Sequence, residues 1–309
     1  FNSTIGGAVS FSQSTDAPDG FSKSMKVQCS TVDTSHTTNQ YISVAQRIEA
    51  QDLQHLAYGT SSAKSMILSW RMKSATYSGP ITVALQTQDG TLEYFVKSYT
   101  PTTSWAEYTC VIPPSTSATI NSDNGEGLRV SFVLAGDSGS SIAASSDSTG
   151  WSTTRADYRS DVGNIVSNTS NEFYITGVQL EAGSTASSFA YESYADTLRK
   201  CQRFYYKSGG QTEHIGQNYS GTNCDTNVAL PVNMRVTPTF SCKDTQGTEN
   251  TGSVYSSGSY NYGVTCGIQT GRSRGNQMAL RLSGVLSPAG SQNDCVQIQF
   301  LDLTFDAEL

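Results

Sequence analysis

Apolar and polar residues alternate with a period of two along much of the chain. The pattern is clearest over 66–73, where Met66, Leu68 and Trp70 alternate with Ile67 and Ser69. Such alternation predicts half-buried β-strands. Clusters of Gly, Pro, Asn and Asp separate the strands, and they lie at 77–80, 89–90, 113–114, 123–127 and 136–140. Many short strands between turns predict an all-β fold of the sandwich or jelly-roll type.

One segment, 191–206, departs from this period. Tyr194, Leu198, Cys201 and Tyr205 recur at i, i+4, i+7 and i+11, which predicts one face of an α-helix. Because β-rich sequence lies on both sides, we expect a short helix that joins two β-sandwich domains. The expected organisation is a jelly-roll domain at 1–190, a helical connector at 191–207 and a C-terminal β-sandwich domain at 208–309.

Two expected strands contain a slip in the alternation. In 172–184 the apolar residues Phe173 and Ile175 are followed, after Gly177, by Val178 and Leu180 in the opposite register. The strand 295–306 changes register in the same way. A one-residue slip moves side chains to the other face of a sheet, so both sites predict β-bulges or bends.

The net charge of the chain indicates which classes of partner it can bind. Only 15% of the 309 residues are charged, and the formal net charge is −7. Nucleic-acid binding needs clustered Lys and Arg, so we expect no nucleic-acid partner. No apolar run is long enough to predict a transmembrane helix or membrane insertion. The seven cysteines match no metal-binding spacing, and we expect free thiols in buried positions.

No arrangement of residues predicts catalysis. The segment 136–141 has the form of a serine-protease loop, but His36, His55 and His214 lie in no partner motif. Glu181 lies at a strand end, and the sequence pairs it with no second acid. We therefore expect no enzyme activity, no catalytic residue and no cofactor.

A loop at 14–22 contains the only candidate cation site. Asp16 and Asp19 flank a Pro–Gly turn there, but calcium needs six to eight oxygen ligands. We expect turn hydrogen bonds and no metal site, with a structural Ca²⁺ ion as the weaker alternative.

Aromatic residues in loop-like segments are the candidates for binding. Trp151 lies near Arg155 and Tyr158, in a segment without apolar alternation. A second group contains Tyr255, Tyr260, Tyr262 and Arg272. Aromatic and polar surfaces of this kind are typical of glycan binding and of interfaces. The alternative, in which these tyrosines cap a sandwich core, stays open.

The helical stripe is the candidate for self-association. Tyr194, Leu198, Cys201 and Tyr205 form an apolar face that two small domains leave uncovered. We expect this face to meet its symmetry mates, and a homotrimer is the expected oligomer.

Several segments resemble one family of proteins. These are "TDAPDGFSKSMKV" (15–27), "RIEAQDLQHLAYGTSSAKSMILSWRMKS" (47–74), "NSDNGEGLRVSFVL" (121–134), "SNEFYITGVQLEAGSTASSFAYESYADTLRKCQRFYYK" (170–207), "LPVNMRVTPTFS" (230–241) and the terminal "FDAEL". They resemble virion structural proteins of tailed double-stranded DNA phages, especially marine ones. That family carries a jelly roll similar to carbohydrate-binding modules, followed by a C-terminal β domain.

The resemblance implies a non-enzymatic tail-fibre, appendage or capsid-decorating subunit. Such a subunit is assembled in the host cytoplasm, is exposed on the particle surface, and contacts other virion proteins and host-surface glycans. Two alternatives remain: a carbohydrate-binding module of a larger polysaccharide-degrading enzyme, and a glycan depolymerase with its own active site.

Overall fold

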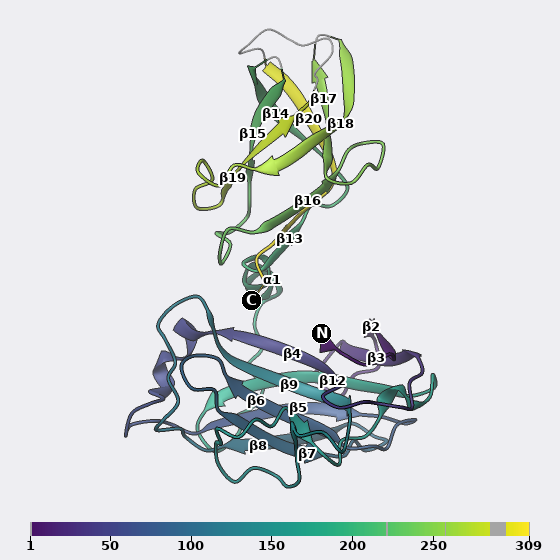
Figure 1. Cartoon of the computed structure of the whole chain (residues 1–309), viewed down its shortest axis with the longest axis vertical. Coiled ribbons are helices and arrows are strands. Elements are labelled where there is room, and N and C mark those ends of the chain that lie inside the picture. Colours follow the sequence, from purple (N-terminus) through teal and green to yellow (C-terminus); the bar gives the residue numbers. More distant parts are fainter. Residues whose placement is uncertain (1, 221, 257, 285–294, 309) are drawn as a thin grey trace. The chain divides into compact units, whose positions relative to one another are not determined.

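The computed structural model describes residues 2–220, 222–256, 258–284 and 295–308 (Figure 1). The chain divides into two compact units, Phe1–Ala190 and Tyr191–Leu309. Nearly all regular structure in both units is β-strand, so the predicted all-β class is confirmed.

The first unit is a sandwich of two five-stranded antiparallel sheets (Figure 1, purple to teal). One sheet has the order β1 (Asn2–Ser3), β4 (Tyr41–Glu49), β9 (Glu126–Gly136), β6 (Ile81–Thr87) and β7 (Tyr94–Tyr99). The other has the order β2 (Ala8–Ser14), β3 (Ser24–Thr31), β12 (Glu172–Ala182), β5 (Met66–Lys73) and β8 (Ala106–Ile112). Short elements complete the unit: β10 (Ala143–Ala144), which pairs in parallel with β11 (Tyr158–Arg159), and the 3₁₀-helices η1 (Ala50–Leu56) and η2 (Ile165–Ser167).

The core of the sandwich lies between the inner faces of these sheets. Trp70 on β5 is 1% exposed, and its ring contacts Tyr108 in a stacked arrangement and Phe132 edge-on. Phe132 belongs to β9 in the opposite sheet, so Trp70 joins the two layers. The alternation over 66–73 therefore predicted the inner face of β5 correctly.

The slip at Gly177 is a β-bulge. Thr176 pairs with Arg71 of β5, and the next pair is Gln179 with Ser69, so β12 contains one extra residue at this point. Gly177 has φ of +60°, a conformation that glycine adopts without the steric penalty of a side chain. The bulge that the sequence predicted is confirmed.

The second unit begins with the helix α1 (Tyr194–Gln202) and continues in strands (Figure 1, green to yellow). The strands are β13 (Tyr205–Lys207), β14 (Gln211–Ser220), β15 (Asn223–Ala229), β16 (Thr239–Lys243), β17 (Thr251–Ser256), β18 (Ser259–Ile268), β19 (Gln277–Ser283) and β20 (Cys295–Asp306). The strand β20 pairs with β14 on one side and with β17 on the other, which closes the order β20-β14-β15-β19-β18-β17. Where the sequence predicted a second sandwich, opposite walls of this closed sheet take the place of two separate layers.

The last strand, β20, bends and pairs with four other strands of the unit. Asp302 has φ of 56°, which places Phe300 and Leu303 in the same core although they are three residues apart. Residues before the bend pair with β14 and β17, and residues after it pair with β13 and with Thr239, Phe240 and Ser241 of β16. Lys243 of β16 pairs with Leu301, just before the bend. The second predicted register slip is thus also confirmed.

Candidate functional site

Trp151, a predicted binding residue, packs against the first unit with part of its side chain. Its Nε1 donates a hydrogen bond to the carbonyl oxygen of Pro113 at 2.8 Å. Its ring meets Tyr58 edge-on, with 6.0 Å between centroids, and lies against the core of the sandwich. Trp151 is therefore half-buried against Tyr58, and a part for it in glycan binding stays a prediction.

Tyr158 was predicted as an exposed binding residue, but it is buried. It is 0% exposed, and its hydroxyl donates to the carbonyl oxygen of Asp137 at 3.0 Å. It packs with Val96 and Val133, which lie on the outer faces of β7 and β9. The segment that contains Tyr158 therefore covers the outside of this sheet. Neighbouring Arg155 forms an ion pair with Asp157 at 2.6 Å.

The structure does bring together the three predicted tyrosines of the second unit. Tyr255 on β17 is the cross-strand partner of Tyr260 on β18, with 4.8 Å between ring centroids. Tyr260 and Tyr262 stack with 5.7 Å between centroids and 12° between ring planes. The exposed fractions of Tyr255, Tyr260 and Tyr262 are 38%, 42% and 48%. We call these three residues the tyrosine row.

Polar side chains lie directly beside the tyrosine row. Gln297 on β20 is the cross-strand partner of Tyr255, and its Nε2 donates to Oε2 of Glu213 at 2.9 Å. Gln299 donates through Nε2 to Oε1 of Glu213 at 2.9 Å and to the hydroxyl oxygen of Tyr260 at 3.3 Å. One carboxylate, two amides and a phenol thus form a connected group at the edge of the aromatic surface. Sequence reasoning missed Glu213 on β14 and Gln297 and Gln299 on β20. The two-residue spacing of Gln297 and Gln299 follows the same rule as the spacing of Tyr260 and Tyr262 on β18.

A buried carboxylate supports the strand that contains Tyr260 and Tyr262. Asp244 is 0% exposed, and its Oδ1 accepts from the backbone N–H groups of Gln246 and Thr248 at 2.9 Å. Its Oδ2 accepts from the N–H of Gly263 at 2.8 Å. Burial raises the pKa of Asp244, but these N–H groups outweigh that effect and lower the pKa below its usual value. Asp244 therefore ties the loop after β16 to the residue that follows Tyr262.

Arg272 lies in a different place from the tyrosine row. It lines a hollow of about 590 Å³, which we call the arginine hollow, and it forms an ion pair with Asp225 at 2.7 Å. Asp225 also accepts two hydrogen bonds from Arg281, each at 2.7 Å. The hydrogen bonds from Arg281 lower the pKa of Asp225 below its usual value. The other residues of the lining are Ile215, Gly216, Gln217, Thr226, Asn227, Gln269, Ala279 and Cys295.

The helical stripe is exposed, but it is shorter than predicted. Tyr194 is 81% exposed, and Leu198 and Cys201 are also exposed on α1. The helix begins after Ser193, whose hydroxyl oxygen accepts from the N–H of Asp196, and it ends at Gln202. Tyr205 is therefore not on the helix. It is exposed in β13, where it pairs with Asp306 of β20.

The loop with Asp16 and Asp19 has its own interactions. Asp16 accepts from Nε1 of Trp105 at 3.0 Å and forms an ion pair with Lys73. The hydrogen bond from Lys73 lowers the pKa of Asp16. Across the described part of the chain, no group of three or more His, Cys, Asp and Glu residues is arranged to hold a metal ion. Within the same described residues, no helix is long and apolar enough to cross a membrane.

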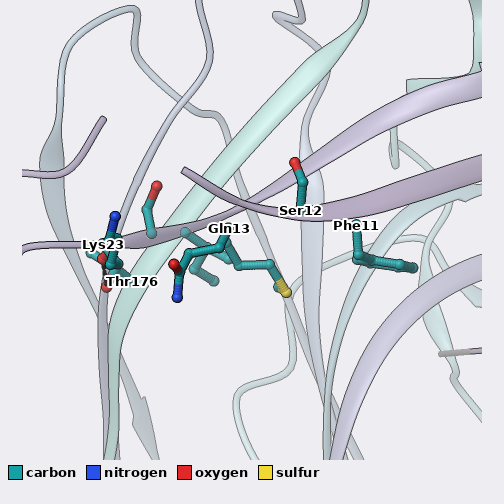
Figure 2. A pocket seen from close by; sticks show the side chains of 8 residues that line it. Phe11, Ser12, Gln13, Lys23 and Thr176 are labelled. Carbon is teal, nitrogen blue, oxygen red and sulfur yellow. Dashed lines mark hydrogen bonds between the residues drawn. The ribbon is translucent and has the colours of Figure 1, made fainter. Parts of the chain in front are cut away.

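A second hollow, in the first unit, was not predicted from the sequence. It has a volume of about 500 Å³ and lies over β2, the start of β3 and β12. Figure 2 shows Lys23 and Thr176 together at one end and Phe11 at the other, with Gln13 between them. Residues 11 and 176 are too far apart in the sequence for a local pattern to indicate this site.

Comparisons with known proteins add a likeness in fold only. No protein family's sequence profile and no curated protein matches this sequence. Among solved structures, one similar chain is the family 11 carbohydrate-binding module of the cellulosomal cellulase Lic26A-Cel5E of Clostridium thermocellum. It is 16% identical, with 60% of this chain and 88% of that chain covered and a TM-score of 0.32. Another is the tandem CBM22-1-CBM22-2 domain of Xyn10C from Paenibacillus barcinonensis, 9% identical, with 100% and 93% covered and a TM-score of 0.29.

Proposed function

We propose that this chain is a non-enzymatic glycan-binding protein and that the tyrosine row is its binding surface. The observation that carries the proposal is the exposed, cross-strand arrangement of Tyr255, Tyr260 and Tyr262. A sugar ring presents C–H groups on its faces and hydroxyl groups at its edge. Aromatic side chains cover such a face with large apolar area at a small cost in conformational entropy.

The polar neighbours of the row match the edge of a sugar ring. Glu213 provides carboxylate oxygens as acceptors, and the amide of Gln297 provides donors and an acceptor. Gln299 is 6% exposed and holds Glu213 and the hydroxyl of Tyr260 in place. Their mutual hydrogen bonds hold these side chains in place before a ligand arrives. Preorganised groups lose less conformational entropy on binding, which favours a defined orientation of the sugar.

The structural contacts of the Glu181 carboxylate favour a non-enzymatic role. Glu181 accepts hydrogen bonds from the N–H and the hydroxyl of Ser187, and Ser187 lowers its pKa. Glycoside hydrolysis usually requires one carboxyl group with a raised pKa opposite a second carboxylate. Glu181 has the opposite shift and holds the chain that follows β12, so it acts as a structural residue in this proposal.

The experiment is affinity electrophoresis or pull-down with a set of neutral and acidic polysaccharides. Wild-type protein is expected to be retained by at least one polymer, and Tyr260→Ala is expected to weaken that retention at least tenfold. The control is Tyr191→Ala, which removes an exposed tyrosine outside the row. Equal retention of wild type and Tyr260→Ala, or no retention of wild type by any glycan, would overturn the proposal.

We further propose a setting for this binding, as a structural component exposed on a tailed-phage virion. The sequence resemblance and the exposed stripe of Tyr194, Leu198 and Cys201 on α1 support it. A homotrimer through this stripe is part of the proposal, and mass photometry at micromolar concentration tests it with Leu198→Lys as the disrupting variant. A monomeric wild type contradicts the homotrimer. The same binding activity also fits a carbohydrate-binding module of a larger polysaccharide-degrading enzyme, and the coding sequence upstream of Phe1 distinguishes the two settings.

A further inference from the structure

We infer that the first unit contains a further binding site, for a glycan that carries acetamido groups, in the hollow that Figure 2 shows. We call it the Phe11 hollow. The site is separate from the tyrosine row, and the inference does not depend on that surface. Its volume of about 500 Å³ lies within the range of roughly 300–1,000 Å³ that small-molecule sites have.

The strand register explains which side chains line the hollow. Gln13 on β2 is the cross-strand partner of Met25 on β3, and Met25 is also the partner of Ile175 on β12. Residues directly opposite each other in a sheet have their side chains on the same face. Phe11 lies two residues before Gln13 on β2, so it is on this face too. Phe11 pairs with Val27, a core residue, and the shared face is therefore the inner face of the sheet.

The inner face of the sheet becomes accessible at this end. Phe11 is 41% exposed, although its partner Val27 is 0% exposed. Gln13 is exposed and Met25 is half-buried, whereas Ile175 on the central strand is 4% exposed. Exposure therefore increases from the centre of the sheet toward its edge strand β2, where the hollow opens. Apolar side chains of the kind that fill the core line an accessible space here.

Two polar side chains of the lining are free to contact a ligand. Among the residues that the structure describes, none forms a hydrogen bond or an ion pair with the side-chain amide of Gln13 or the ammonium group of Lys23. Thr176 differs, because its hydroxyl donates to the carbonyl oxygen of Lys23 at 3.0 Å. This bond holds the residue before β3 beside the bulge in β12. The Gln13 amide offers donors and an acceptor, and Lys23 offers donors only.

The combination of a free amide with an apolar lining determines the ligand class. An acetamido group consists of a planar amide and a methyl group. Its amide donates to and accepts from the amide of Gln13, and its methyl group packs against Met25 and Ile175. A sugar with hydroxyl groups alone would place a polar group against those two apolar side chains, and a polar group that is buried without a hydrogen-bond partner weakens binding.

The two ends of the hollow contact the sugar rings themselves. Figure 2 shows Phe11 at one end and Lys23 at the other, with Gln13 between them. Two residues along a strand span about 7 Å, so a ligand held by Gln13 also reaches the ring of Phe11. That ring covers the C–H face of a neighbouring sugar, and the ammonium group of Lys23 donates to hydroxyl oxygens. The site therefore favours a short chain of N-acetylated sugars over a single sugar.

The test compares the binding of two trisaccharides to the full chain by titration calorimetry. N,N′,N″-triacetylchitotriose and cellotriose are both β-linked chains of glucose-type rings, and they differ in one substituent of each ring, acetamido in the first and hydroxyl in the second. Wild-type protein is expected to bind the acetylated trisaccharide at least tenfold more tightly than cellotriose. Phe11→Ala and Gln13→Leu are each expected to weaken binding of the acetylated trisaccharide at least tenfold.

Two matched variants serve as controls. Val111→Ala truncates an apolar side chain that is also 41% exposed, on β8, the opposite edge strand of the same sheet. Gln46→Leu removes an exposed amide from β4 in the other sheet. Each control is expected to change the affinity less than twofold. Thermal unfolding of every variant establishes that it is folded before its affinity is compared.

The outcomes separate this inference from the proposed function. If the wild type binds neither trisaccharide, or binds both equally well, the inference is wrong. If Tyr260→Ala abolishes binding of the acetylated trisaccharide while Phe11→Ala and Gln13→Leu do not, the ligand occupies the tyrosine row, so the inference fails and the proposed function stands. Binding that depends on Phe11 and Gln13 but not on Tyr260 supports the inference, even if the tyrosine row retains no polysaccharide.

Discussion

The ring of Phe21 lies against the α-carbon of Gly177, at the point where β12 slips by one residue. A β-carbon on Gly177 would lie 2.7 Å from Cζ of Phe21, and Gly177 has φ of +60°. Phe21 in turn meets Phe189 edge-on, with 5.0 Å between ring centroids. The bulge therefore provides the space in which the segment after β12 folds back on the outer face of its sheet.

Replacement of this glycine is expected to destabilise the first unit. Gly177→Ala adds both a left-handed backbone penalty and a clash with Phe21, and together they cost about 2–4 kcal/mol. Chemical denaturation measures the change in the free energy of unfolding. Gly150→Ala is the control, because a β-carbon there meets no atom within 4 Å, and we expect a change within about 0.5 kcal/mol. Equal stability of the two variants would show that the ring of Phe21 is not fixed at the bulge.

Trp151→Ala is expected to lower stability without weakening glycan binding. The side chain packs against Tyr58 and donates to Pro113, so its removal leaves a cavity and removes one of the two hydrogen bonds that the Pro113 carbonyl accepts, at a cost of about 2–4 kcal/mol. Thermal unfolding measures the first effect, and polysaccharide retention per folded molecule measures the second. A loss of retention in a variant that remains folded would return Trp151 to the binding surface.

The stability of the second unit is expected to fall in acid because of Asp244. Its pKa is lowered in the folded state, so the unfolded chain takes up the proton first as pH falls. The stabilisation is therefore complete above the unfolded pKa of about 3.9 and is lost as pH falls from there through the folded pKa. Melting curves between pH 2.5 and 7 measure this slope.

Asp244→Asn provides the comparison for the pH measurement. Its Nδ2 amide would face the N–H of Gly263 in place of an acceptor, so we expect a melting temperature several degrees lower at pH 7. The difference from wild type is expected to shrink as pH falls below about 3.9, where the unfolded wild-type chain takes up the proton, and to be smallest below the lowered pKa of the folded state. Parallel melting curves over the whole pH range would contradict the assignment to Asp244.

The cysteines are expected to differ sharply in their reaction with an alkylating agent. All seven are free thiols, and Cys201 and Cys295 are exposed. Burial raises the pKa of Cys110, and burial raises the pKa of Cys224 to about 11, so few of these thiols are ionised at neutral pH. Mass spectrometry after brief treatment with iodoacetamide should find Cys201 and Cys295 modified and Cys110 and Cys224 unmodified, with unfolded protein as the fully modified reference. Early modification of Cys224 would show that the second unit opens.

Local patterns in the sequence were sufficient to predict which face of a strand a side chain is on. The period of two placed Met66, Leu68 and Trp70 on one face, and it also identified both bulges, because a slip in that period has few other structural causes. The same rule makes Tyr260 and Tyr262 neighbours on one face of β18. These features follow from contacts between residues close in the sequence.

Only the tertiary structure decided which strands and loops meet. Trp151 and Tyr158 lie in a segment without alternation, and their burial depends on a loop that returns over β7 and β9. Two features join residues that are far apart in the chain. One is the ion pair between Arg272 and Asp225, and the other is the pairing of β20 with β17, which closes the sheet of the second unit. The sequence by itself determined the strands, their inner faces and their bulges, because alternation reports the direction of each side chain. The structure alone determined the tyrosine row's polar neighbours and the arginine hollow, because these depend on strand order, which alternation does not report.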